Sequence, residues 1–482
     1  MANSLFATKP IGELHEASSA DELHRVLDAR MLVLMGIGAI IGTGIFVLTG
    51  TAAANHAGPA LVLSFIIAGI GCAFEGLCYA EFAAMIPVSG SAYSYSYATL
   101  GEFIAWFVGW NLILEYLFAA ATIAVGWSGY VVSLMNQIGL HLPDALTNAP
   151  LAKGATHWSL VQTGALINLP AVLILCVMSA LCYVGIHQSA RFNAIVVAIK
   201  VTVIVLFIGF GAWYVQGANW EPFIPPNTGP GQFGWSGVVT AAGIIFFAYI
   251  GFDAVSTAAQ EARNPQRDMP IGILVSLAIC TVLYIGVAAV LTGMVPYQEL
   301  NTPAPVALAL DRYSGLAWLA GWVKLGAIAG MTSTMLVMLL GQPRIFYAMS
   351  KDGLLPPVFA KVHPKFRTPS FSTVLTGAVA ATVAGLFPVT ILGELVSIGT
   401  LMAFIVVCIG VLVLRRTRPD LKRPFRVKAP WFVCTAGALI CAYMMISLPK
   451  DTWVRLLVWT FFGLLVYFFY GRKHSALARR PD

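Results

Sequence analysis

The sequence predicts an all-α integral membrane protein that crosses the bilayer twelve times. Of its 482 residues, 59% are hydrophobic and only 10% are charged, and the mean hydropathy is +0.82. Soluble domains carry roughly 25% charged residues, so this composition excludes a water-soluble globular protein. A helix needs about 20 predominantly apolar residues to cross a bilayer. Such runs lie at about 31–54, 60–86, 103–134, 164–184, 193–215, 235–259, 270–295, 316–347, 371–389, 391–414, 430–448 and 453–470.

The positions of the lysines and arginines predict which side of the membrane each loop faces. If residues 1–30 are cytoplasmic, all but six of the 28 basic residues lie on the cytoplasmic side. Two of the six, Lys200 and Lys324, fall within spans. The four on the opposite side are Lys153, Arg312, Lys450 and Arg455. We therefore expect a multi-pass protein of the plasma (inner) membrane with both termini in the cytoplasm, and no nucleic-acid partner despite the net charge of +7.

The predicted divisions of the chain follow the spans, because no soluble domain or low-complexity segment interrupts them. They are a cytoplasmic segment with a short surface helix at 1–30, spans over 31–215 and 235–414, a basic cytoplasmic loop at 415–429, two spans over 430–470 and a cytoplasmic tail at 471–482. The basic run Arg415–Lys428 predicts contact with anionic lipids. All eight cysteines fall within spans without a CxxC pair, so we interpret them as packing residues rather than a disulfide framework.

Glycines interrupt the first span in "GIGAIIGTGIF", residues 36–46, although each costs a helix roughly 1 kcal/mol relative to alanine. The sixth span carries a similar interruption, "AYIGFD", which ends at Asp253. Paired interruptions at corresponding positions indicate a transporter site at the interface of two repeats. The repeats would be 31–215 and 235–414, the second inserted inverted because five spans is an odd number. Close helix packing is the alternative explanation for the glycines.

Broken helices occur in membranes where they line a cavity or bind something, because free backbone groups are costly in hydrocarbon. A break at Gly42–Gly44 leaves a half-helix N-terminus, whose free N–H groups suit a carboxylate. The carbonyls freed at Ile40–Ile41 and Phe247–Ile250 suit an ammonium group. Together the two sets of groups describe an α-amino acid.

Four motifs also resemble a known family. They are "GIGAIIGTGIF" at 36–46, "CYAEFAAMIPVSGSAYSYSY" at 78–97, "FFAYIGFDAVSTAAQEARNPQRDMPIGI" at 246–273 and "GQPRIFYAMSKDGLLP" at 341–356. In this order, and over essentially the whole chain, they resemble the amino acid–polyamine–organocation superfamily, and within it the bacterial relatives of the cationic amino acid transporters. The resemblance implies a LeuT-like fold: a 5+5 inverted repeat with broken helices 1 and 6, and peripheral spans 11 and 12.

The resemblance also implies a substrate site at the two breaks. Thr43 and Gly44 would hold the substrate carboxylate. The carbonyls that would hold the α-amine are those of Ile40, Phe247, Ala248 and Ile250. The complete predicted substrate-binding set is Ile40, Ile41, Gly42, Thr43, Gly44, Glu115, Phe247, Ala248, Ile250 and Met331.

Lys200 is the sharpest functional candidate among the charges within spans, which are functional by default. It lies about 13 Å beyond Arg191 along the fifth span, at 1.5 Å per residue. Burial disfavours the charged form of a lysine, so such a group can exchange a proton near neutral pH. In proton-coupled members of the superfamily a span-5 lysine stands where sodium-coupled relatives bind a cation, which implies that Lys200 carries the proton. Snorkelling to the cytoplasmic interface is the alternative.

Four acidic residues within spans complete the candidate set. Glu115 lies near the middle of span 3, and the resemblance places such a glutamate near the side-chain end of the pocket, as a second protonation site or a counter-charge; a structural hydrogen bond is the alternative. Asp253 follows the second break and Glu81 belongs to "CYAEF", so we expect gating or structural roles for both. Glu75 departs from the family pattern, and the sequence assigns it no role.

Met331, in "AGMTSTML", is the pocket wall that the resemblance implies. A methionine there would shorten the side-chain end of the site and favour small neutral substrates over long cationic ones. The hydroxyls of residues 332–334 would suit sodium, since hard cations prefer oxygen ligands. The nearby ammonium of Lys200 would repel Na⁺, so we expect protons to be the coupling ion.

The sequence thus predicts a secondary active transporter that imports small neutral L-amino acids by proton symport with alternating access, with no metal and no cofactor other than the proton. A cationic (arginine or lysine) transporter and an amino acid exchanger are the alternatives. A membrane enzyme is disfavoured because HExxH, GxSxG and paired metal-ligand spacings are missing, and a channel because no filter motif occurs. The preferred amino acid, the oligomeric state (a monomer being one option) and small membrane partners stay open.

Overall fold

The computed structural model describes residues 5–10, 12, 27–88, 90–154, 160–185 and 190–477. Most of the predicted surface helix in segment 1–30 and residues 478–482 of the tail therefore lie outside the described residues. The first half of the chain forms α2 (Ala29–Ile40), η1 (Gly44–Leu48), α3 (Thr49–Ala52), η2 (Ala53–Ala57), η3 (Gly58–Ala60), α4 (Leu61–Met85), α5 (Ser91–Thr99), α6 (Glu102–Gln137), α7 (Leu169–Val184) and α8 (Ala190–Gly211).

The second half is helical in the same way. It forms α9 (Gly234–Ile245), η7 (Phe246–Tyr249), α10 (Phe252–Thr257), α11 (Pro265–Met294), α12 (Pro305–Asp311), α13 (Ala317–Lys351), α14 (Ser370–Leu386), α15 (Val389–Thr417), α16 (Pro430–Ser447), α17 (Lys450–Val466), η12 (Tyr467–Gly471) and α18 (Arg472–His474). The remaining short helical turns lie in loops. In the loop after α6, the strands β1 (Leu151–Lys153) and β2 (Leu160–Gln162) pair antiparallel, which the loop sequence did not predict.

The chain is thus a mostly helical membrane protein, as predicted. Nine helical segments of the described chain are long and apolar enough to cross a bilayer, rather than the twelve predicted. Three shorter apolar helices account for the difference: α2, α7 and α14. The helix α2 is short because it ends at the glycine-rich break, and α7 and α14 have only 16 and 17 helical residues. The helical turns after the break run into α4 without a gap, so the end of the first predicted span and the whole second span form one segment, Gly44–Met85.

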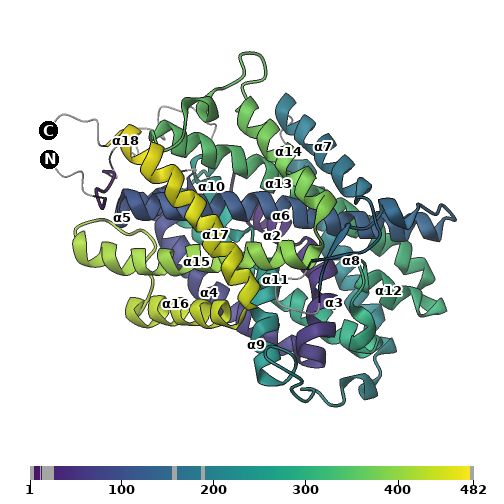
Figure 1. Ribbon diagram of the computed structural model, residues 1–482. Coiled ribbons are helices and arrows are strands. Elements are labelled where there is room, and N and C mark those ends of the chain that lie inside the picture. The colour runs from purple at the N-terminus through teal and green to yellow at the C-terminus, as the bar shows by residue number, and fades with distance from the viewer. Residues whose placement is uncertain are drawn as a thin grey trace.

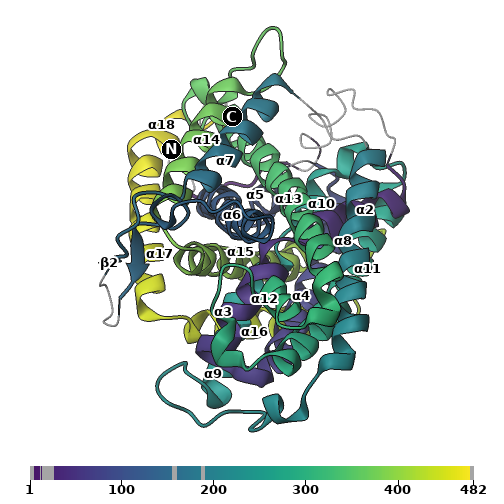
Figure 2. The ribbon, with the colours of Figure 1, turned by 90° about the vertical axis from the view of Figure 1, so that its right-hand side faces the viewer.

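The long helices α6 and α13 pack along each other at the centre of the molecule, with α15 on another side of α6 (Figure 1). Turned by 90°, the view runs nearly along α6 and shows the other helices around it, with α7 beside α14 and α17 at the outer edge (Figure 2). On the other flank, α11 packs against both α2 and α4. This arrangement brings the two predicted breaks, at Gly42–Gly44 and in "AYIGFD", to the interior, next to α6, α8 and α13.

Candidate functional site

The first break lies at Ile41 and Gly42, between α2 and η1. Ile41 leaves helical geometry, with φ −74° and ψ 102°, and the chain becomes helical again at Thr43. Instead of resuming as an α-helix, it continues as the wider π-helical turn η1. The glycine pattern thus marks a point where two half-helices meet end to end, with backbone groups available on both sides.

The second break lies between α9 and α10. The helix tightens into the 3₁₀ turn η7, Ile250 is extended and Gly251 has φ +123°. Only glycine adopts such a conformation readily. A Cβ at Gly251 would also lie 2.6 Å from the carbonyl oxygen of Ala39, at the end of α2. The second break is therefore held against the first by a contact that needs a glycine.

The two breaks touch each other around a very small cavity. A Cβ at Gly44 would overlap the backbone of Ala248, so the glycine allows η1 and η7 to meet. The cavity has a volume of about 10 Å³, which is room for about one water molecule. Its lining residues are Ala39, Ile40, Gly42, Thr43, Gly44, Ala119, Ile123, Phe247, Ile250, Thr334 and Met338. An occupant larger than water therefore has to move the half-helices apart.

Three of the carbonyls predicted to hold an amine already accept hydrogen bonds, those of Ile40, Phe247 and Ala248. The hydroxyl of Tyr284, on α11, lies 2.9 Å from the carbonyl oxygens of both Ile40 and Ala248 and shares its single proton between them. The carbonyl of Phe247 accepts from the N–H of Ile250 at 3.1 Å. A carbonyl oxygen has two lone pairs, so each of these groups retains one acceptor position. Tyr284 was not singled out in the sequence, because a tyrosine within an apolar span carries no local signal of such a bridge.

Lys200 reaches the first break from α8. Its buried ammonium donates to the carbonyls of Gly38 (2.6 Å) and Ile41 (2.9 Å) and to the hydroxyl of Thr334 on α13 (2.9 Å). All three ammonium protons are thus used. The snorkelling alternative is wrong, because the side chain lies fully buried among α2, α8 and α13. The predicted amine ligand Ile41 accordingly binds this lysine.

Thr43 lies between the small cavity and a second, much larger cavity that is described below. Its hydroxyl lies 3.2 Å from the sulfur of Met331 and 3.4 Å from the carbonyl of Ile123. Met331 is buried behind this contact and is not among the cavity-lining residues of the described chain, whereas Thr334 and Met338 of the same helix are. On α13 the small cavity is thus lined by Thr334 and Met338, and the role of Met331 as a pocket wall stays a prediction.

Glu115 and Asp253 lie buried on the other side of the cavity. Glu115 is one helical turn from the cavity-lining Ala119, and neither of its carboxyl oxygens has a hydrogen-bond partner within the described part of the chain. Asp253 accepts from the hydroxyl of Tyr116 at 2.9 Å and from the N–H of Gly251 at 3.2 Å. Asp253 therefore fixes the start of α10, while Glu115 is an unsatisfied carboxyl that the cavity does not reach.

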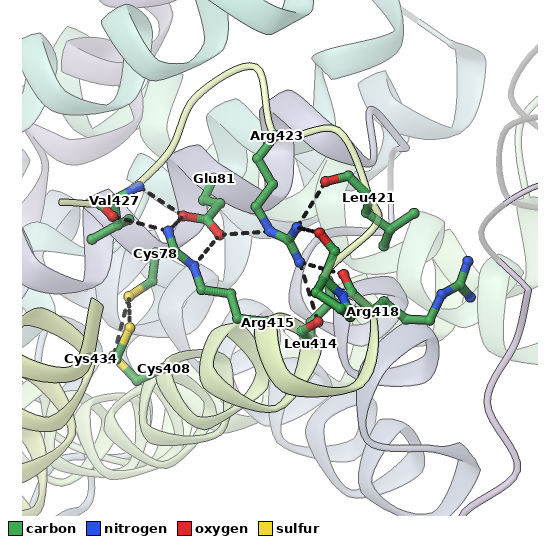
Figure 3. A network of polar contacts seen from close by, with 11 residues as sticks. Cys78, Glu81, Cys408, Leu414, Arg415, Arg418, Leu421, Arg423, Val427 and Cys434 are labelled. Atoms are coloured by element: carbon green, nitrogen blue, oxygen red, sulfur yellow. Dashed lines mark hydrogen bonds and ion pairs between the residues drawn. The ribbon is translucent and has the colours of Figure 1, made fainter. Parts of the chain in front are cut away.

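Glu81, at the end of α4, holds the loop between α15 and α16 (Figure 3). Its carboxylate accepts a bidentate pair from Arg415, with Nε at 2.9 Å, and a hydrogen bond from the N–H of Val427 at 2.8 Å. Arg423 adds an ion pair at 3.6 Å. Desolvation lowers the pKa of the Arg423 guanidinium, and the facing Glu81 opposes this shift. Glu81 thus lies far from the cavity and organises a loop.

Glu75 lies one turn or more deeper in α4 among cysteines. Its Oε1 accepts from the thiols of Cys408 at 3.2 Å and Cys441 at 3.6 Å, and its Oε2 has no partner in the described chain. Nearby, the sulfur of Cys78 lies 3.5 Å from that of Cys408 and 3.6 Å from that of Cys434 (Figure 3). The cysteines are free and buried at the junction of α4, α15 and α16, as expected of packing residues.

The larger cavity, of about 1810 Å³, lies at the opposite end of α15 from the basic loop. Val47 and Gly126 line it, one helical turn from the small cavity. Its wall also carries Lys153, which pairs with Glu394 at 3.0 Å and with Asp451 at 3.5 Å. A molecule in this vestibule is therefore separated from the two breaks by little more than Thr43 and its neighbours.

Comparisons with known proteins identify the family to which the chain belongs. A family model described as "Amino acid permease" matches residues 28–470. The methylthioribose transporter of Bacillus subtilis is 50% identical over 98% of this chain and 99% of its own length, and the branched-chain amino acid permease BcaP of the same organism is 47% identical over 99% and 100%. A vacuolar cationic amino acid transporter 4 of Arabidopsis thaliana is 39% identical over 87% of this chain and 68% of its own.

These matches confirm the resemblance drawn from the four motifs, including its link to the cationic amino acid transporters. They also confirm that the chain is not an enzyme. The chain belongs to the amino acid permease family of membrane transporters.

Proposed function

We propose that this chain imports neutral L-amino acids with small apolar side chains, by proton symport and alternating access at the two breaks. The observation that carries the proposal is the meeting of two half-helix junctions around one cavity, with Lys200 tied to the first junction. The protein would lie in the plasma membrane with both termini in the cytoplasm, and the vestibule of about 1810 Å³ would face outward. The excess of basic residues on the side of the termini supports this orientation.

The proposed fold is LeuT-like, with twelve spans in a 5+5 inverted repeat and two peripheral helices. In this reading, α2 with the turns after it is broken span 1, and α9 with η7 and α10 is broken span 6. The shorter α7 and α14 are spans 4 and 9, which correspond under the repeat. Their side-by-side packing, which both views show (Figures 1 and 2), supports the assignment.

The substrate carboxylate would bind the free N–H groups at the start of η1, around Thr43 and Gly44. A half-helix N-terminus carries partial positive charge and unpaired donors, both of which favour an anion. The ammonium group would use the second lone pairs of the Ile40 and Ala248 carbonyls, or displace the Tyr284 hydroxyl from them. The side-chain end faces Ala119, Ile123 and Met338, a wholly apolar wall that offers no partner to a charged side chain.

Proton coupling would act through the number of N–H groups on Lys200. A protonated lysine has three donors and here uses all of them on Gly38, Ile41 and Thr334. A neutral lysine has two and lacks the positive charge, so loss of the proton weakens the hydrogen bonds that hold the carbonyls of Gly38 and Ile41, at the end of α2, to α8. The proton would thus hold α2 in place while substrate enters, and its release would free α2 to move.

Two alternatives are favoured by particular observations. Glu115 is an unsatisfied carboxyl one turn from the apolar wall, and a rearrangement that exposed it would give a cationic side chain a partner. The name of the Bacillus subtilis methylthioribose transporter points instead to a thioether sugar, whose apolar methylthio end the wall would also fit. An exchanger without net proton movement is the third reading.

Uptake into proteoliposomes of the purified protein tests the proposal. Labelled alanine, leucine, arginine and methylthioribose would be compared, with and without an inward proton gradient. Gradient-driven accumulation of alanine or leucine is the expected result. Accumulation of arginine alone, or of methylthioribose alone, would overturn the substrate class. Uptake only against preloaded internal amino acid would overturn symport in favour of exchange.

A further inference from the structure

The connection between α15 and α16 is a basic loop, residues 415–429, whose arginines do not all face the same way. Arg415 and Arg423 turn inward to the buried carboxylate of Glu81 (Figure 3). The N–H of Val427 joins the same carboxylate. Arg423 also donates to backbone carbonyls within the loop, including that of Leu421 at 2.8 Å. The contacts with Glu81 therefore hold one side of the loop against the protein, and the remaining basic side chains lie on the other, exposed side.

The outer side of the basic loop is strongly cationic. Its exposed basic residues are Arg416, Arg418, Lys422, Arg426 and Lys428. They face a single acid, since Asp420 is the one acidic residue in 415–429, and it pairs with Arg418 at 3.5 Å. Four cations thus remain without an acidic partner in the described chain. In a mobile polybasic tail such charges would be spread over many positions. In this loop the contacts with Glu81 fix the backbone, so the cations stay close together.

Two aromatic side chains border this surface where α16 begins. Trp431 is 54% exposed and Phe432 is 67% exposed. The guanidinium of Arg416 lies 4.4 Å from the centre of the Trp431 ring, a cation–π distance. Tryptophan is enriched where a membrane protein passes from lipid to water. The surface thus combines clustered cations with two exposed apolar rings.

We propose that the outer side of the basic loop binds anionic phospholipid headgroups of the leaflet that it faces. Clustered cations next to a span attract anionic lipids, and the adjoining Trp431 and Phe432 fit a ligand that has acyl chains. A soluble anion would use the cations and leave the rings exposed. Because Glu81 belongs to α4, the bound lipid would also stabilise the junction of α4, α15 and α16 in the intact protein.

Lipid-dependent stability of the full-length protein tests this inference. The apparent melting temperature would be followed during titration with phosphatidylglycerol, with phosphatidylcholine as the neutral lipid and inorganic phosphate as the soluble anion. Phosphatidylglycerol alone is expected to raise the melting temperature. Each basic residue near an anionic surface contributes about fivefold in affinity. The triple variant Lys422→Gln, Arg426→Gln and Lys428→Gln should therefore need about a hundredfold more phosphatidylglycerol.

A matched control removes three other exposed lysines on the same side of the protein: Lys351→Gln, Lys361→Gln and Lys365→Gln. It has the same net charge as the test variant and should keep the wild-type response. Equal losses in both variants would reduce the effect to net charge and overturn the site. An equal shift with inorganic phosphate would replace the lipid by a free anion. Lys422→Gln alone, with an expected fivefold change, keeps the test readable if the triple variant unfolds.

Discussion

Replacing Lys200 with methionine separates proton coupling from folding. Methionine keeps an unbranched, apolar stem but has no N–H donor. The three hydrogen bonds of the ammonium are lost, and bonds to a charged group contribute about 1.5–3 kcal/mol each. Burial of that charge costs several kcal/mol, which the variant no longer bears. The hydroxyl of Thr334 still reaches the carbonyls of Gly38 and Ile41, so we expect the free energy of unfolding to change by only about 1–3 kcal/mol.

The transport consequence is larger and follows from the gradient. A difference of one pH unit corresponds to about 1.4 kcal/mol per proton. With one proton carried per substrate, that is enough to concentrate the substrate about tenfold inside a vesicle. The wild-type protein should approach this ratio when the membrane potential is held at zero. Lys200→Met should bring the inside concentration only to the outside value, because nothing in the variant takes up the proton.

The assay is uptake of labelled alanine or leucine into proteoliposomes, followed to a plateau. Exchange against preloaded internal substrate, measured on the same vesicles, shows that the variant is folded and still binds. Lys324→Met is a suitable control, because it removes another buried lysine, one that pairs with Asp311 at 2.8 Å away from the breaks, and should keep the tenfold plateau. A tenfold plateau in Lys200→Met would refute the assignment of the proton to this residue.

Three further substitutions test the site itself. Met338→Ala should enlarge the apolar wall of the cavity and raise uptake of substrates one or two methylenes longer by about tenfold, measured by competition; an unchanged substrate range would contradict the role of the wall. Gly251→Ala should destabilise the protein by at least about 2 kcal/mol in thermal unfolding, because alanine is strained at this backbone conformation. The control is Gly321→Ala, where nothing lies within 4 Å of the added Cβ, and it should be neutral or slightly stabilising. Equal effects of the two substitutions would count against the strain argument. Tyr284→Phe should cost about 1–3 kcal/mol and loosen the contact between the breaks, seen as faster backbone hydrogen exchange at residues 40 and 248; unchanged exchange would show that the hydroxyl bridge is dispensable.

The breaks were predictable from sequence because their cause is local. Glycines in the middle of an apolar run are costly in a helix, so "GIGAIIGTGIF" and "AYIGFD" indicate interruption without any knowledge of neighbours. The need of Lys200 for hydrogen-bond partners was predictable for a similar reason, since an ammonium group within a membrane span has to be satisfied by the protein. The number of separate helices was less predictable, because a helical turn at residues 58–60 lets the first span continue into α4.

The missed contacts all depend on which helices meet. Tyr284 bridges Ile40 and Ala248, which are separated by more than two hundred residues in sequence. Met338 lies two helical turns beyond Met331 on the same face of α13, so the cavity wall depends on the depth of the breaks along this helix, which the spacing does not contain. Glu81 and the basic loop are also far apart in sequence. Neither composition nor spacing contains that information, so the sequence could predict a gating or structural role for Glu81 but not its partners.

The cavity of about 10 Å³ has a consequence for the energetics of the cell. A carrier whose vacant site stayed filled with water would offer a chain of hydrogen-bonded molecules along which protons could hop with no cargo. Here the two breaks meet around a cavity with room for about one water molecule, which is too small for a continuous chain of water molecules. If uptake is driven by a proton gradient, as proposed above, this closure would prevent protons from leaking through the protein without substrate.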